Sequence, residues 1–314
     1  MRILDDLRAG LSPAGEQLVE RFDQGYPAPL PKREMVVEAA TATAFLAVAG
    51  LMAALIPGQR ELDPLLAATL VVAYALMSRV RFVARYGFTV PTQLIFVPML
   101  FILPTGAVPL FVAAGIVAGS LPDYLIGRQH PSRALRLPGD AWHSIGPALV
   151  IGLAGSPAAS LSEWPLLVAA LVAQLLFDNL VSTLREWAGL GISPRLDPAP
   201  LGWIALVDVL LSPIGLVAAI AATVEPYAVL LVLPLAGLLA VFAAARQARV
   251  HQAVELSRAY RGTTLLRADV LEADDEYTGV HSQGVVALSV AVADAMGPHE
   301  RDAVCTTYEV VRER

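Results

Sequence analysis

Apolar and polar positions divide the chain into a long membrane-like stretch and a shorter polar end. From residue 36 to residue 244, apolar runs are separated by short polar loops, and many runs have the roughly 20 residues that a helix needs to cross a bilayer core. We therefore predict an all-α protein, a polytopic transmembrane bundle of about eight helices. The predicted spans are 36–57, 64–80, 88–104, 107–126, 140–156, 163–184, 201–222 and 227–244.

The third and fifth predicted spans are short, and they contain Pro98 and Pro147. Neighbouring helices can satisfy the backbone groups that proline leaves free inside a membrane. We expect these two segments to be tilted, kinked or re-entrant.

The basic residues of the loops alternate along the chain. Loops after the second, fourth, sixth and eighth spans carry arginines, whereas the intervening loops hold Arg60 alone. Because loops rich in arginine and lysine stay in the cytoplasm, we expect both termini to be cytoplasmic. Residues 1–34 lack the apolar core and cleavage site of a signal peptide and are predicted to form a cytoplasmic lead.

Composition agrees with a membrane location. Of the 314 residues, 56% are hydrophobic and 16% are charged, against about 45–50% and about 25% in soluble domains. The net charge of −6 and the dispersed basic residues give no reason to expect a nucleic-acid partner. The single cysteine, Cys305, excludes an internal disulfide.

Several ionisable and polar side chains fall within or at the ends of the predicted spans. Such residues are costly at membrane depth and usually have a function. We predict an intramembrane polar site near the cytoplasmic side, with Arg85, Arg128 and Arg185 available as partners. Its members are Asp123, Asp140, His143, Asp178, Asn179 and Asp208. Three interpretations stay open: a polar lock between helices, a ligand-sensing pocket, and an ion or proton path.

The polar C-terminal end begins after residue 244. Apolar residues recur at approximately helical spacing in 245–272, which predicts a cytoplasmic connector helix that could pair two copies of the chain as a homodimer. The alternative is an amphipathic helix lying on the membrane. Residues 273–297 contain a second helix that stops at Gly297-Pro298, and 298–314 form a tail that we expect to be poorly ordered.

The segment from Asp275 to Gly297 resembles the opening helices of HD-GYP phosphohydrolase domains. The matching pattern is Asp-x-Tyr-Thr-Gly-x-His-Ser, followed by Val-x-x-Leu-Ser-x-x-Val-Ala-Asp-x-x-Gly. The resemblance implies a bacterial inner-membrane signalling protein whose family hydrolyses cyclic di-GMP on a binuclear or trinuclear iron or manganese centre. It also implies that His281 stands at a metal-ligand position.

The family's His-Asp dyad is absent from the chain, and its only Gly-Tyr-Pro precedes the first span. One histidine cannot hold a binuclear centre that activates water, so we expect no cofactor in this chain and no activity from the chain alone. We predict a sensor-type membrane module joined to a truncated HD-GYP-like segment. The alternatives are a transporter or small-molecule-binding subunit that uses Asp178 and Asp208, and a non-enzymatic regulator that pairs with a full-length partner.

Overall fold

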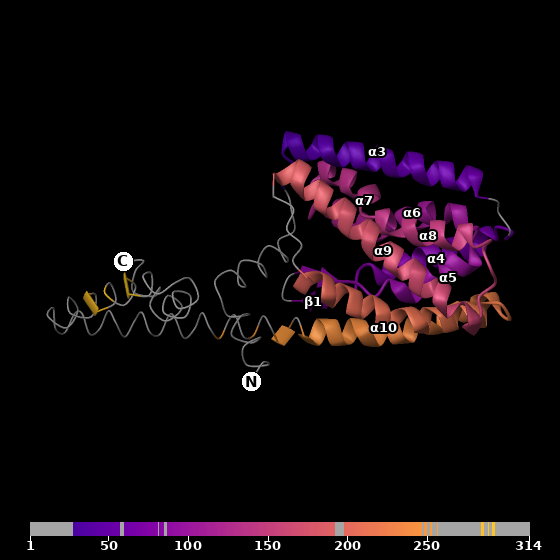
Figure 1. Ribbon diagram of the computed structural model, residues 1–314. Coiled ribbons are helices and arrows are strands. Elements are labelled where there is room, and N and C mark those ends of the chain that lie inside the picture. Colours follow the sequence, from indigo (N-terminus) through magenta and orange to yellow (C-terminus); the bar gives the residue numbers. More distant parts are fainter. Residues whose placement is uncertain are drawn as a thin grey trace. The chain divides into compact units, whose positions relative to one another are not determined.

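Figure 1 shows a computed structural model of the protein. It describes residues 28–56, 60–80, 82–84, 87–191 and 198–246, together with isolated positions beyond 246; at 82–89, 198–201 and 203–204 only the backbone is described. The chain divides into two compact units, of which Gln24–Ala245 is one, and Met1–Asp23 with Arg246–Arg314 is the other. The predicted connector 245–272, the HD-GYP-like segment and the tail lie almost entirely outside the described residues.

Helices make up nearly all of the described part of Gln24–Ala245 (Figure 1). The α-helices are α3 (Lys32–Leu55), α4 (Pro64–Met77), α5 (Gln93–Ile102), α6 (Val108–Leu125), α7 (Arg136–Gly139), α8 (Ile145–Leu153), α9 (Trp164–Arg185) and α10 (Pro198–Ala222), followed by a helical stretch over 233–246. Short 3₁₀ turns are η1 (Thr105–Ala107), η2 (Pro131–Leu135), η3 (Trp142–Ser144), η4 (Leu161–Glu163) and η6 (Pro226–Val232), and η5 (Glu186–Leu190) is a π-helical turn. One antiparallel hairpin pairs β1 (Phe82–Ala84) with β2 (Gly87–Thr89).

Five helical segments of the described chain are long and apolar enough to cross a membrane. They are Lys32–Leu55, Thr105–Leu125, Leu161–Leu190, Ala205–Ala222 and Pro226–Arg246. Their interiors correspond to the predicted first, fourth, sixth, seventh and eighth spans, because each carries an unbroken apolar run of bilayer length. The all-helical fold is therefore confirmed, and the five long apolar helices suggest a membrane protein.

The three remaining predicted spans are shorter than expected, and span 64–80 forms α4 with 14 residues. Span 88–104 begins in β2 and continues as α5, whose ten residues cover only about 15 Å. Span 140–156 is broken into η3 and α8, with nine residues in α8. Residues 93–101 of α5 are all buried, because this mostly apolar helix packs among other helices of the bundle.

The long helices instead expose large apolar side chains. On α9 an exposed row repeats every four residues: Trp164, Val168, Val172, Leu176, Leu180 and Leu184. Residues four apart are neighbours on a helix surface, but each step of four passes a full turn by about 40°, so the row winds about half-way around α9. These exposed apolar side chains, which would be unfavourable in water, suit a helix at the edge of a bundle in lipid.

Two glycines bring α4 and α6 into close contact. A Cβ on Gly115 would lie 2.7 Å from Tyr74 Cδ1, and a Cβ on Gly119 would lie 2.8 Å from the Ala75 carbonyl oxygen. Small residues four apart allow close approach of helices in membranes. This packing places the Tyr74 ring in the middle of the bundle.

Contacts at the helix ends show that neighbouring segments run in alternate directions. The start of α3 meets the end of α9 through Glu38 and Arg185, and the end of α4 meets the end of α6 through Arg79 and Asp123. The end of α3 lies beside η1, where a Cβ on Gly106 would clash with the Met52 carbonyl. We call the end of the bundle with Arg79, Arg136 and Arg185 the arginine-rich end, and the opposite one the Arg60 end.

Candidate functional site

A chain of buried hydrogen bonds joins three helices in the middle of the bundle. The Gln93 amide on α5 donates to Gln174 Oε1 on α9 over 2.8 Å, and Gln174 Nε2 donates to Asp208 Oδ2 on α10 over 2.9 Å. All three side chains are buried, with Asp208 only 7% exposed. We call Gln93, Gln174 and Asp208 the amide–carboxylate relay. Its hydrogen bonds hold together helices that are far apart in the sequence.

Local structure places each member of the relay. Gln93 is the first residue of the buried helix α5, whereas Gln174 and Asp208 lie near the centres of long helices. Ser212, one turn after Asp208, donates its hydroxyl to the Asp208 backbone carbonyl over 2.6 Å. No described Lys, Arg or His forms an ion pair with the Asp208 carboxylate. Its described side-chain partner is therefore a neutral amide. A carboxylate buried among membrane helices is costly, and here no described positive charge offsets that cost.

Tyr74 and His143 lie close to the relay. The Tyr74 hydroxyl and His143 Nε2 are hydrogen-bonded at 3.3 Å, and the His143 ring meets Phe96 edge-to-face at 5.6 Å between centroids. Asp208 and Asp178 lie near Tyr74. Polar groups from α4, η3, α9 and α10 thus gather around the start of α5.

A second polar cluster lies at the arginine-rich end. Arg185 donates to Glu38 and to Asp140, each with a nitrogen–oxygen distance of 2.7 Å, and Arg136 donates to Glu34 over 2.7 Å. Arg136 Nε faces Glu38 Oε1 at 3.2 Å without forming a hydrogen bond. Glu34 and Glu38 stand one turn apart on α3, so a single helix face supplies both carboxylates.

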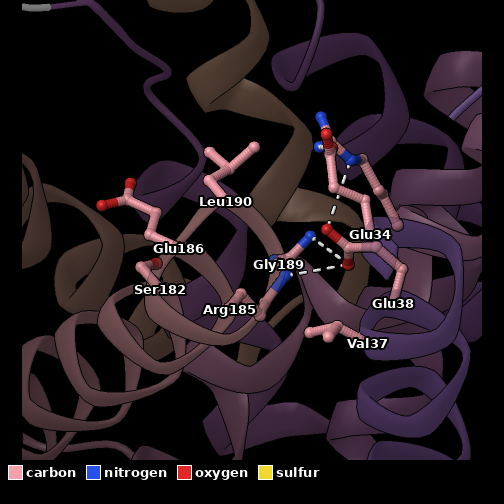
Figure 2. Close-up of a pocket in the computed structure, with 9 residues that line it drawn as sticks. Glu34, Val37, Glu38, Ser182, Arg185, Glu186, Gly189 and Leu190 are labelled. Atoms are coloured by element: carbon pink, nitrogen blue, oxygen red, sulfur yellow. Dashed lines mark hydrogen bonds and ion pairs between the residues drawn. The ribbon is translucent and has the colours of Figure 1, made fainter. Parts of the chain in front are cut away.

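A cleft of about 240 Å³ opens beside this cluster (Figure 2). It is lined by Glu34, Val37, Glu38, Arg136, Ser182, Arg185, Glu186, Gly189 and Leu190. The π-helical turn η5 forms one wall, and Gly191 ends this turn in the left-handed conformation with φ of 74°. We call this cleft the arginine-rich cleft. In Figure 2 the carboxylates of Glu34 and Glu38 lie on one side of Arg185, and Glu186 and Ser182 lie on the other.

Arg60 makes a different kind of site at the opposite end. Its guanidinium donates to the carbonyls of Leu100 (2.8 Å), Leu103 (3.1 Å), Ser156 (3.1 Å) and Pro157 (2.8 Å). It also donates to Thr105 Oγ1 over 3.1 Å. Burial lowers the pKa of this guanidinium from its ordinary value, but arginine stays charged in proteins. The side chain therefore caps the C-terminal end of α5 with a positive charge.

The structure separates the residues that we predicted to form one site. Asp123 contacts Arg79 at 3.4 Å, Asp140 joins the cluster at the arginine-rich end, and Asp208 belongs to the relay. Asp178 and Asn179 are partly buried on α9. His281 lies outside the described residues. The predicted residues thus fall into separate local groups, with Asp208, Asp178 and His143 near Tyr74 and with Asp123 and Asp140 beside arginines.

Sequence reasoning missed Gln93, Gln174, Glu34 and Glu38. Glutamine carries no charge and gives little signal in an apolar run, and the two glutamates stand where a span boundary was expected. Their spacing of four on one helix face was the available signal. Among the described residues, no three His, Cys, Asp or Glu side chains are grouped so that they could hold a metal ion. Comparison of the chain with family models, curated proteins and solved structures finds no match.

Proposed function

We propose that the chain is the membrane-embedded input module of a bacterial signalling protein. The amide–carboxylate relay carries this proposal. It couples α5, at the centre of the bundle, to α10 through Gln174, and α10 leads through η6 into the last helical stretch before the C-terminal segment. A change at the relay would therefore shift the helices nearest to the output end of the chain.

The proposed topology has eight crossings with both termini in the cytoplasm. The alternate directions of the segments support eight crossings, since α5 and α8 both run from the middle of the bundle toward the Arg60 end. A short helix can serve in a crossing where protein surrounds it. The arginine-rich end then faces the cytoplasm, as expected from the distribution of basic residues in bacterial inner-membrane proteins.

The proposed output is a non-catalytic HD-GYP-like segment. Residues 275–297 resemble the start of that domain, but the chain has no His-Asp dyad, so the segment would act on a partner instead of hydrolysing cyclic di-GMP itself. Pairing through 245–272, with a second copy or with an active relative, would provide the contact.

A reporter of cyclic di-GMP in a bacterium tests this function. We expect expression of the full chain to change the reporter signal, and Gln174→Met to abolish the change at equal abundance in the membrane. Leu176→Met, at an exposed position of the same helix, is the matched control and should behave as the wild type. A signal identical to that of the empty vector would reject the signalling proposal.

A second candidate function is transport or binding of a small molecule inside the bundle. The observation that favours it is the buried Asp208 carboxylate, which no described cationic side chain neutralises. Reconstituted protein that takes up a solute, and loses uptake in both Asp208→Asn and Asp178→Asn, would support transport over signalling.

A further inference from the structure

The arginine-rich cleft has more negative than positive charge. Three carboxylates line it (Glu34, Glu38 and Glu186), against the guanidinium groups of Arg136 and Arg185, while Asp140 and Arg33 add one charge of each sign outside the lining. Arg33 donates to the Ala188 carbonyl over 2.7 Å at the edge of η5. The net charge of −1 within this group favours a cationic ligand over an anionic one.

The hydrogen-bonding groups that remain open point to the same class of ligand. Arg185 uses all three of its nitrogens on Glu38 and Asp140. In contrast, neither the Glu186 carboxylate nor the Ser182 hydroxyl hydrogen-bonds to any residue of the described chain. Both open groups can accept hydrogen bonds, although the hydroxyl can also donate one, and an ammonium group is a pure donor with three N–H bonds.

The size and walls of the cleft limit the ligand further. A volume of about 240 Å³ is below the range of about 300–1,000 Å³ that is typical of pockets for drug-sized molecules. Val37 and Leu190 contribute apolar wall, which suits a short alkyl chain. The open groups, Glu186 and Ser182, lie on the same side of Arg185 (Figure 2), which suits one ammonium group.

We propose that the arginine-rich cleft binds an alkylammonium group, with Glu186 and Ser182 as ligand-binding residues. The ammonium could belong to a soluble short diamine or to the headgroup of phosphatidylethanolamine, since both present the same donor to the cleft. The proposal does not depend on the signalling role of the chain.

Calorimetric titration of the purified full chain with putrescine tests the proposal. The protein is held in nanodiscs of phosphatidylcholine, which has no N–H donor. We expect saturable binding by the wild type, and an increase in Kd of up to about fivefold in Glu186→Gln, which is the effect of losing about one exposed charge interaction. Ser182→Ala should weaken binding in the same direction.

Glu163→Gln is the matched control, because it removes the same charge at the other end of the same helical segment. Binding that is absent in the wild type, or that is equal in Glu186→Gln and Glu163→Gln, would overturn the proposal, as would preferential binding of inorganic phosphate. Nanodiscs that contain phosphatidylethanolamine separate the two sources. Loss of putrescine binding in them assigns the site to the lipid headgroup, and unchanged binding assigns it to a soluble amine.

Discussion

Arg185 and Glu38 are 147 positions apart in the chain, and their side chains are in direct contact. Arg185 Nε and one terminal nitrogen both approach Glu38 Oε2, at 2.9 and 2.7 Å. This pair ties the start of α3 to the end of α9. It also holds the arginine-rich cleft in shape, because both residues line it.

Removal of the Glu38 charge should destabilise the bundle. Glu38 is only 5% exposed, so Glu38→Gln leaves Arg185 and Arg136 with less charge compensation, and we expect a loss of about 3 kcal/mol in the free energy of unfolding. Unfolding in mixed micelles measures it. Glu186→Gln is the control at a neighbouring, exposed carboxylate, and it should change stability by no more than about 0.5 kcal/mol. Equal losses in the two variants would show that the ion pair does not stabilise the fold.

Gln174 should matter for stability because it is the middle member of the relay. Gln174→Met keeps the length of the side chain but leaves the Gln93 amide and the Asp208 carboxylate without this partner. Interhelical hydrogen bonds in membranes contribute about 0.6 kcal/mol on average and up to about 1.7 kcal/mol, so we expect a loss of about 1–3 kcal/mol for the two bonds together.

Double-mutant cycles between Gln174 and Asp208 test the coupling directly. If Gln174→Met and Asp208→Asn lower the free energy of unfolding additively, the two side chains act independently and the relay is not a unit. Leu176→Met serves as the control on the lipid-facing side of α9.

Replacement of Arg60 should destabilise the protein even when the new residue keeps the positive charge. Lysine cannot reach the four carbonyls that the planar guanidinium bonds, because it has one nitrogen in place of a fork. We expect Arg60→Lys to lower the free energy of unfolding by about 2 kcal/mol, with Glu61→Gln, at the exposed neighbouring position, close to the wild type. An Arg60→Lys protein of unchanged stability would contradict the capping role.

Trp164 and Trp187 should mark the two surfaces of the bilayer. They are 63% and 54% exposed at opposite ends of the segment Leu161–Leu190, and their 23-residue separation corresponds to about 35 Å. That distance exceeds the hydrocarbon thickness of about 30 Å, and tryptophan prefers the interfaces.

Variants that retain one of these two tryptophans, with the others replaced by phenylalanine, allow a measurement of depth. In vesicles with lipids brominated at different depths, each tryptophan should be quenched most by bromine near the headgroups. Strongest quenching of either residue by bromine near the bilayer centre would place α9 differently in the membrane.

The sequence alone was sufficient to predict the outer helices. Segments such as Lys32–Leu55 and Leu161–Leu190 carry apolar runs of bilayer length, and this property is local. The alternation of arginines in the loops is also local. It places these arginines at one end of the bundle, as the contacts of Arg79, Arg136 and Arg185 do, and the orientation in the membrane stays a prediction.

Only the tertiary structure showed the lengths and contacts of the helices inside the bundle. Apolar composition does not distinguish a helix in lipid from a helix surrounded by protein, so α5 and α8 were expected to be longer than they are. The contacts of Glu38 with Arg185, and of Gln174 with Asp208, depend on how helices far apart in the sequence rotate against one another. Side-chain packing between helices sets that rotation, and it cannot be predicted from the spacing of polar residues along one helix.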